Sequence, residues 1–380
     1  MPTAPSSGLP AARAPRAGRL QAGALDAISD VAGVTVGHAT LTAGAVQTGV
    51  TVIRPHAGDV FRNKVPAAAV VFNGFGKSIG LMQLEELGLL ETPIALTNTL
   101  SVGAVATGQI QAAIEANPGI GRTLPTVNPL VFECNDGYLN DIQAMIVEPR
   151  HYHAAAAACA PQFGQGAIGA GRGMSCFDLK GGIGSSSRVV SIAAGDGAAG
   201  MTNAHYCVGA LVLANFGKLE QLTISGLPIG ERLLRQRLAA AAGSEEGTAA
   251  GAKSGTTADP ASPEMGSIIM IIATDAPLDA RQLRRLAMRC GIGLGRTGSI
   301  YGHGSGDLAL AFSTAATLPH QASGISHISA SLHDHLLDPL FQAVTESIEQ
   351  SILNALYAAE SVTGFAGHQR QALCELLNQA

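Results

Sequence analysis

The sequence predicts a layered α/β fold, and three features lead to this prediction. Short segments rich in Val, Ile and Thr alternate with helical segments along most of the chain. Charged residues make up 13% of the 380 residues and hydrophobic residues 47%, so many positions must be buried in layers or at subunit interfaces. No internal repeat is evident in the sequence. Strands flanked by helices therefore favour one layered domain.

Strands and helices follow one another in the first half. Residues 28–55 contain Val/Thr segments separated by glycines, which is typical of strands and turns. Residues 67–72 (AAAVVF) predict a buried strand, followed through the loop NGFGKS by a helix at LMQLEELGLL. A strand over 93–99 precedes a helix over 102–115.

A glycine-dense stretch, residues 164–188, opens the second half. Glycine loses much backbone entropy on ordering, so this density predicts tight turns or close backbone approach rather than regular structure. A basic helix, ERLLRQRLAA, follows two further strands. The remaining predicted elements are strands at 189–194, 207–214 and 308–313, and helices at 279–290 and about 340–360.

Composition and charge exclude several classes of function. A net charge of −5 without a basic block argues against a nucleic-acid partner, and no apolar run is long enough to cross a membrane. Residues 1–24 are rich in Pro, Ala and Arg without an apolar core, so we expect a flexible leader and not a secretory signal. The six cysteines form no CxxC pair, so reduced thiols in a cytoplasmic protein without a metal are expected.

An abrupt change of composition marks residues 241–267. Residues 241–265 contain almost no large apolar side chain and predict a mobile tether that connects parts of one domain. Gly266 and Ser267 then begin a continuous apolar run, Ile-Ile-Met-Ile-Ile-Ala, typical of a strand buried on both faces. The ordinary interpretation is a surface loop entering a core strand.

Ser267 suggests a second interpretation of this junction. Its hydroxyl could attack the Gly266 carbonyl, which no side chain shields, and cut the chain there. Ser267 would then carry a free α-amine, whose reference pKa of about 7.7–8.0 allows it to act as a general base. The products would be a long chain, residues 25–266 after the leader, and a short chain, residues 267–380, in one globular domain.

Three further segments carry candidate site residues, each with an ordinary alternative. Ser305 and Asp307 in GSGD could hold the nucleophile's amine and hydroxyl, but a Gly-Asp turn also explains the pattern. The segment ECNDGYLND, residues 133–141, gathers donors and acids, or is a capped turn. Asn215 follows a buried strand, where its amide could donate to an oxyanion or cap the chain.

Three other patterns are weak signals. GLGRTG matches GxGxxG but follows a helical segment, and NGFGKS lacks the first glycine of a phosphate-binding loop, so neither predicts a nucleotide site. His333 and His335 form an HxH pair. On a helix-like segment this spacing is expected to separate the two rings, which argues against a metal site.

Long motifs across residues 25 to 360 resemble the L-aminopeptidase/D-amidase-esterase family, which includes the β-peptidyl aminopeptidases. These motifs include GVTVGHATL, NGFGKSIGLMQLEELGLLETPIALTNTLSVG, ECNDGYLND, GAGRGMSCFDLKGGIGSSSR, GALVLANFG, GSIIMIIATDAPL and RTGSIYGHGSGDLALAFSTA. The resemblance implies a four-layer αββα sandwich like that of N-terminal nucleophile hydrolases but with different connectivity. It also implies self-cleavage and assembly of several cleaved chain pairs.

The resemblance assigns roles by motif. Ser267 matches the nucleophile, and the Gly266–Ser267 bond the cleavage point. Asn215 and Tyr138 match residues that stabilise the oxyanion, and Ser305 and Asp307 match those that orient the nucleophile. Glu133, Tyr301 and His303 are expected to bind substrate. The family implies no cofactor. The sequence departs from the family pattern at two places: the tether before Ser267 is longer than expected, and position 307 is Asp where some members have Glu.

The expected function is a self-processing aminopeptidase. It would release N-terminal residues, including β-amino acids or D-residues, from short peptides, amides or esters through a serine acyl-enzyme. Acyl transfer of the ornithine acetyltransferase type is an alternative, although those relatives use Thr as the nucleophile. A non-catalytic oligomeric binding protein is the alternative outside enzymes. The expected assembly is a homo-oligomer of cleaved chain pairs.

Overall fold

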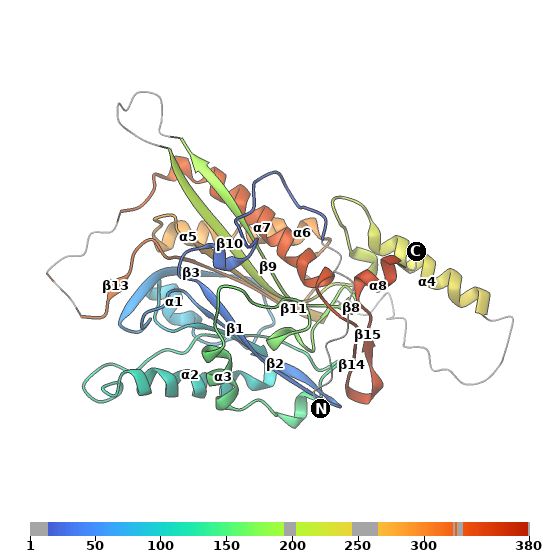
Figure 1. Cartoon of the computed structure of the whole chain (residues 1–380), viewed down its shortest axis with the longest axis horizontal. Helices are drawn as coiled ribbons and strands as arrows, with labels where there is room; N and C mark the ends of the chain where they lie inside the picture. Colours follow the sequence, from blue (N-terminus) through green and yellow to red (C-terminus); the bar gives the residue numbers. More distant parts are fainter. Residues whose placement is uncertain (1–13, 194–202, 245–264, 322–323, 325–329, 379–380) are drawn as a thin grey trace, which may run out of the picture.

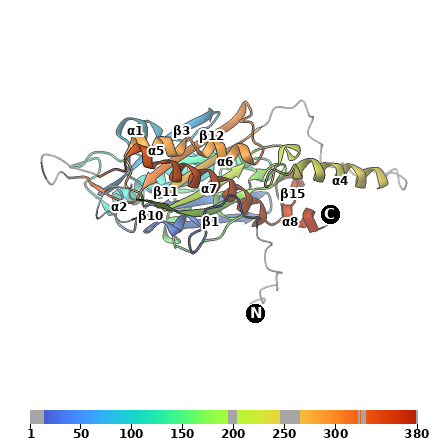
Figure 2. The same cartoon turned by 90° about the horizontal axis from the view of Figure 1, so that it is seen from above.

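Two large β-sheets lie face to face between two layers of helices, so the structure is an αββα sandwich, as predicted (Figures 1 and 2). The computed structural model describes residues 14–193, 203–244, 265–321, 324 and 330–378. Three hydrophobic clusters fill the spaces between the four layers. The fold is therefore held by three stacked interfaces.

The first sheet consists of strands from the first third of the chain. Its order is β1-β2-β5-β6, and only β5 and β6 run parallel. Two helices cover its outer face through small residues such as Ala106 and Ala155. The elements are β1 (Thr35–Ala43), β2 (Val46–Arg54), β5 (Ile94–Asn98), β6 (Val131–Cys134), α2 (Val102–Ala116) and α3 (Pro149–Ala157).

The second sheet brings together strands from across the whole chain. Its order is β13-β3-β12-β11-β10-β9, with β4 paired to β3, and only β11 and β12 run parallel. Helices α5, α6 and α7 lie on its outer face (Figure 1). The bounds are β3 (Asn63–Gly74), β4 (Leu89–Leu90), β9 (Gly182–Ile192), β10 (Ala204–Asn215), β11 (Met265–Thr274), β12 (Gly304–Ser313), β13 (Leu318–Pro319), α5 (Ala280–Ala287), α6 (Cys290–Arg296) and α7 (Asp338–Tyr357).

Smaller elements surround the sandwich. Helix α1 leads from β3 to β4, and the hairpins β7–β8 and β14–β15 lie outside the two large sheets. Helices α4 and α8 extend beyond the sandwich (Figure 2). The bounds are α1 (Leu81–Leu87), β7 (Ser175–Cys176), β8 (Leu179–Lys180), α4 (Ile229–Ser244), β14 (Val362–Thr363), β15 (Gln369–Arg370) and α8 (Leu373–Asn378).

Strand β11 explains the continuous apolar run after Ser267. Ile268, Met270 and Ile272 face the helices, whereas Ile269 and Ile271 face the other sheet. Successive side chains of a strand point to opposite faces, so a strand between two covered faces is apolar at every position. The prediction of a strand buried on both faces is confirmed.

The glycine-dense stretch is more regular than predicted. Strand β9 begins at Gly182, not near residue 189, and it includes the Gly-Ser-Ser-Ser-Arg run. A Cβ atom on Gly184 would lie 1.9 Å from the carbonyl oxygen of Ser351 in α7. Glycine therefore lets the helix approach the strand backbone, so the close approach was predicted correctly but the irregularity was not.

Parts of the predicted leader and of the predicted tether belong to ordered structure. Helix α4 continues to Ser244, and β11 begins at Met265. Of the predicted tether 241–265, residues 245–264 lie outside the described residues. Of the leader 1–24, residues 14–24 pack against the domain, and residues 1–13 lie outside the described residues.

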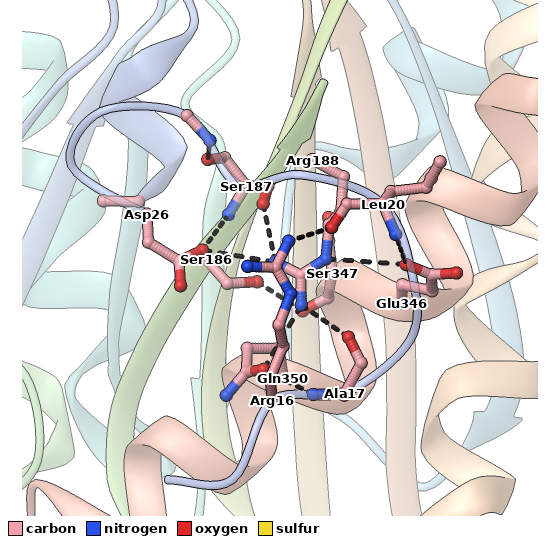
Figure 3. Close-up of polar contacts among 12 residues, drawn as sticks. Arg16, Ala17, Leu20, Asp26, Ser186, Ser187, Arg188, Glu346, Ser347 and Gln350 are labelled. Carbon is pink, nitrogen blue, oxygen red and sulfur yellow. Dashed lines mark hydrogen bonds and ion pairs between the residues drawn. The ribbon is translucent and has the colours of Figure 1, made fainter. Parts of the chain in front are cut away.

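Arg188 anchors the N-terminal segment to strand β9 and helix α7 (Figure 3). Its guanidinium donates to the carbonyl oxygen of Ala17 at 2.8 Å and lies 3.2 Å from Asp26 and 3.6 Å from Glu346. The Glu346 carboxylate also accepts the backbone N–H of Leu20 at 2.9 Å. This network surrounds a wholly buried cation with carbonyl oxygens and carboxylates, and it explains why the segment is ordered.

None of the helices in the described residues is both long enough and apolar enough to cross a membrane.

Candidate active site

Ser267 lies near the start of β11, between strands β10 and β12. It pairs with Asn215 on the antiparallel side and with Gly306 on the parallel side. Its hydroxyl donates to the Gly266 carbonyl oxygen at 2.6 Å and accepts the backbone N–H of Gly306 at 3.2 Å. The side chain is 5% exposed. The hydroxyl is thus held against the peptide group that the predicted cleavage would break.

Gly266 is required here by packing. A Cβ atom at this position would lie 2.4 Å from the carbonyl oxygen of Asn215 and 2.8 Å from the Cα of Phe216. Strand β10 therefore approaches the backbone too closely for any other residue. The missing side chain thus leaves the Gly266 carbonyl unshielded and also makes room for the neighbouring strand.

Ser305 and Asp307 lie in strand β12, beside the start of β11. The sequence placed GSGD in a loop before the strand, but Gly304 is the first residue of β12. The Ser305 hydroxyl donates to Asp307 at 2.5 Å, and both side chains are about 1% exposed. Because the parallel register pairs Ser267 with Gly306, the two predicted residues flank the pairing partner of Ser267.

Asn215 ends strand β10, and two contacts fix the orientation of its side-chain amide. Its Oδ1 accepts the backbone N–H of Ser175 at 2.8 Å, and its Nδ2 donates to the carbonyl oxygen of Asn135 at 3.0 Å. A backbone N–H can only donate and a carbonyl can only accept, so the two ends of the amide cannot be exchanged. The side chain is 6% exposed.

Tyr138 lies in the loop after β6, with its side chain 38% exposed. Its ring stacks on His368 with centroids 4.6 Å apart, and the Arg370 guanidinium carbon lies 3.8 Å from the ring centre. In the described part of the chain none of its hydrogen bonds reaches Ser267 or Asn215. Sequence reasoning missed His368 and Arg370, because no local pattern links the C-terminal hairpin to this loop.

Glu133 is a buried residue of strand β6 and not part of a loop. One carboxylate oxygen accepts the backbone N–H of Lys77 at 2.7 Å, and the other accepts the Thr99 hydroxyl. A Cβ atom on Gly76 would lie 3.6 Å from this carboxylate and 3.9 Å from the Cα of Gly306. Glu133 is therefore an acidic group close to the loop that approaches Gly306, the partner of Ser267 in β12.

Tyr301 and His303 lie just before β12, but their surroundings differ. Tyr301 is half-buried and stacks on Phe72 with ring centroids 5.7 Å apart. Burial, and then the charge of Asp307, raise the pKa of Tyr301 to about 12, so its phenol is neutral at physiological pH. His303 is exposed. The packing therefore supports Tyr301 as a pocket residue more strongly than His303.

Two of the weak patterns in the sequence lie in helical segments. Gly293 and Gly295 of GLGRTG lie inside helix α6, not after a strand. His333 and His335 stack with centroids 5.6 Å apart, so the expected separation of their rings is wrong. His333 caps a single 3-10 turn and His335 lies within that turn, and this local geometry brings the two rings onto the same side. No group of three or more His, Cys, Asp or Glu side chains with metal-site geometry occurs among the described residues.

Known proteins are similar to this chain over nearly its whole length. Residues 26–370 match Peptidase family S58. The β-peptidyl aminopeptidase BapA of Sphingosinicella microcystinivorans is 38% identical over 362 residues, which cover 92% of this chain and 86% of that protein. The solved PH0078 protein from Pyrococcus horikoshii OT3 is 44% identical, with a TM-score of 0.83 and 96% of each chain covered.

A second solved structure concerns the fold itself. The L-aminopeptidase D-Ala-esterase/amidase from Ochrobactrum anthropi is 32% identical, with a TM-score of 0.80 and 95% and 96% of the two chains covered. It is described as a prototype for the serine aminopeptidases and a new variant of the Ntn hydrolase fold. The chain therefore belongs to peptidase family S58 and is a serine hydrolase of the N-terminal nucleophile type.

Proposed function

We propose that this protein is a self-processing serine aminopeptidase whose nucleophile is Ser267. One observation carries the proposal: the Ser267 hydroxyl contacts the Gly266 carbonyl oxygen at 2.6 Å at the start of a buried strand. This position holds the hydroxyl against the one peptide group whose cleavage would make Ser267 the N-terminus of a new chain.

Self-cleavage proceeds through an ester. The Ser267 oxygen attacks the Gly266 carbonyl carbon, the carbon–nitrogen bond breaks, and the Ser267 nitrogen gains a proton. Water then hydrolyses the ester and leaves a Gly266 carboxylate and a free Ser267 α-amine. The Gly306 N–H, which donates to the Ser267 oxygen at 3.2 Å, helps to position that oxygen.

The new amine is the general base for turnover. It takes the proton of the Ser267 hydroxyl as that oxygen attacks a substrate carbonyl, and the leaving amine departs with a proton. Water resolves the acyl-enzyme. The reference pKa of an α-amine is about 7.7–8.0, so the rate should fall as the pH drops below this range and the amine becomes protonated.

The surrounding side chains supply charge stabilisation. Asn215 pairs with Ser267 across two strands and donates through Nδ2 to the oxyanion. Ser305 and Asp307 provide the acidic partner that a buried amine requires. Glu133 provides a second carboxylate for a substrate ammonium. Tyr138 as a second oxyanion donor stays a prediction, because its ring contacts here are with His368 and Arg370.

The relatives support the substrate class. BapA, of which this chain covers 86%, is named a β-peptidyl aminopeptidase, and the Ochrobactrum enzyme is named an L-aminopeptidase and a D-Ala esterase/amidase. We therefore propose N-terminal residues of short peptides, amides or esters as substrates, with β-amino acyl groups among them.

Replacing Ser267 with Ala tests the proposal. Denaturing mass spectrometry of the purified wild-type protein should show a fragment of residues 267–380, and the variant should remain one chain without hydrolysis of aminoacyl p-nitroanilides. Ser313→Ala is the matched control, because Ser313 is a buried serine at the end of β12 that lies away from Gly306, the partner of Ser267. This change should leave cleavage intact. A wild-type chain that stays uncut, or a Ser267→Ala chain that is still cut there, would refute self-processing.

A further inference from the structure

Lys180 is a wholly buried cation next to the candidate active site. Its Nζ donates to three backbone carbonyl oxygens, those of Gly181 at 2.7 Å, Met174 at 2.8 Å and Gly171 at 2.9 Å. An ammonium group has three protons, so every one of them has an acceptor. The hydrogen bonds of Lys180 in β8 therefore all go to backbone carbonyl oxygens.

The three carbonyls belong to one segment, residues 171–181, which contains the β7–β8 hairpin. A single side chain thus fixes this segment at its beginning, middle and end. Gly181 N also donates to the Met174 carbonyl, which closes the segment on itself. The residue that this arrangement holds in place is Ser175, the first residue of β7.

Ser175 is the partner that orients Asn215. Its backbone N–H donates to Asn215 Oδ1 at 2.8 Å, and this contact leaves Nδ2 on the other side of the amide. Nδ2 has two hydrogens, and its contact with the Asn135 carbonyl uses one of them. The second hydrogen remains for an oxyanion formed next to Ser267, which pairs with Asn215.

Asp136 supports the second contact of Asn215. It directly follows Asn135, is wholly buried, and accepts Asn140 Nδ2 at 3.0 Å. It also packs against the segment that Lys180 fixes, because a Cβ atom on Gly173 would lie 2.8 Å from the Asp136 Cβ. The two buried charges therefore hold the two backbone groups that flank the Asn215 amide.

We propose that Lys180, with Asp136 beside it, is a positioning residue that holds the Asn215 amide with Nδ2 directed to the oxyanion. The proposal deepens the proposed function and rests on it. Lys180 does not touch the substrate; it acts through the hairpin and the Ser175 N–H. Without the ammonium, three carbonyls lose their common donor, the hairpin shifts, and Asn215 can rotate away from the productive orientation.

Burial lowers the pKa of Lys180 to about 7 and raises the pKa of Asp136 to about 7, and the attraction between the two groups offsets only part of each shift. Burial therefore disfavours the charged form of each group, and the three carbonyl contacts of the Lys180 Nζ are what hold the hairpin.

A double-mutant cycle tests the inference on fully cleaved enzyme, with aminoacyl p-nitroanilides as substrates. Removing an oxyanion donor typically lowers kcat by about 100-fold or more, so Lys180→Met alone should lower kcat by about 10-fold or more with KM nearly unchanged. In the Asn215→Ala background the same change should lower kcat by less than about 3-fold, because residues that act as one unit are not additive. Equal losses in both backgrounds would refute the proposal.

Lys64→Met is the matched control, because Lys64 donates to Glu91 and Phe61 in a part-buried ion pair outside the proposed machinery. It should leave kcat unchanged. If Lys180→Met does not melt cooperatively, Asp136→Asn, which preserves size and an acceptor for Asn140, replaces it in the cycle and decides by the same criterion. An uncut wild-type protein contradicts the proposed function, whereas a cut, active protein with an additive cycle contradicts only this inference.

Discussion

Lys180 and Arg188 lie at the two ends of one stretch of sequence, and both are wholly buried, yet their surroundings differ. Arg188 contacts two carboxylates, Asp26 and Glu346, as well as backbone carbonyls (Figure 3). The contacts of Lys180 are backbone carbonyls. Along β9 the register places Gly182 opposite Ala214, beside Asn215, and Arg188 opposite Val208, away from Ser267.

The comparison shows two uses of a buried cation. The Arg188 guanidinium is permanently charged, and paired carboxylates let it fasten a distant segment of the chain to the core. The Lys180 ammonium satisfies the backbone of a hairpin that contacts the candidate active site. We therefore expect changes at Arg188 to affect stability, and changes around Lys180 to affect catalysis.

Arg188→Met should give the largest effect on stability. The change leaves Glu346, which is 3% exposed, without its cationic partner, and breaking a buried ion pair typically costs about 3–5 kcal/mol. The free energy of unfolding, measured by urea denaturation, should fall by that amount, while kcat of the cleaved enzyme stays the same. A large loss of kcat with little change in stability would reverse the distinction between the two cations.

Asp136→Asn should give an intermediate effect that depends on pH. Burial raises the pKa of Asp136 from the usual value near 4 to about 7, so its contribution to stability is complete below about pH 4 and is lost as the pH rises through 7. The Asn side chain does not titrate. The melting temperature of the variant, relative to that of wild type, should therefore rise steadily between pH 4 and pH 8. If the melting temperatures of the two proteins instead change with pH in parallel, the burial effect on the Asp136 carboxyl is contradicted.

Arg281→Met should give the smallest effect. Arg281 forms two contacts of 2.8 Å with Asp334, but both side chains are largely exposed. Exposed ion pairs contribute little because water already solvates both charges. Urea denaturation should not distinguish the variant from wild type. A clear loss of stability would show that the exposure of an ion pair does not determine how much it contributes to the free energy of unfolding.

Several candidate site residues could be found in the sequence because they lie at strand ends, where a polar or glycine-rich stretch meets an apolar run. The junction at Ser267 combines a polar stretch with an apolar strand, and GSGD precedes another apolar strand. Their neighbourhood, however, is set by the parallel pairing of β11 with β12 and the antiparallel pairing with β10. Local sequence does not encode which strands pair, so only the sheet order brings these residues together.

The positioning residues could not be predicted for a related reason. Lys180 looks like an ordinary surface residue in its motif, since lysine is almost never fully buried unless its charge is satisfied. His368 and Arg370 carry no pattern that joins them to Tyr138, which lies 230 residues before His368. Burial and long-range contacts depend on how distant elements close on one another, and this information is spread over the whole chain.

Strand periodicity and composition are local properties, so the amino-acid sequence alone indicates the layered α/β class, the doubly buried strand after Ser267 and the candidate nucleophile. Only the folded structure shows that the approach of β10 requires Gly266, that part of the glycine-rich stretch forms β9, and that Lys180 and Asp136 are buried beside the segments that hold the Asn215 amide. These features arise from packing between segments far apart in the chain. Their energies depend on exclusion of water, which the folded molecule alone provides.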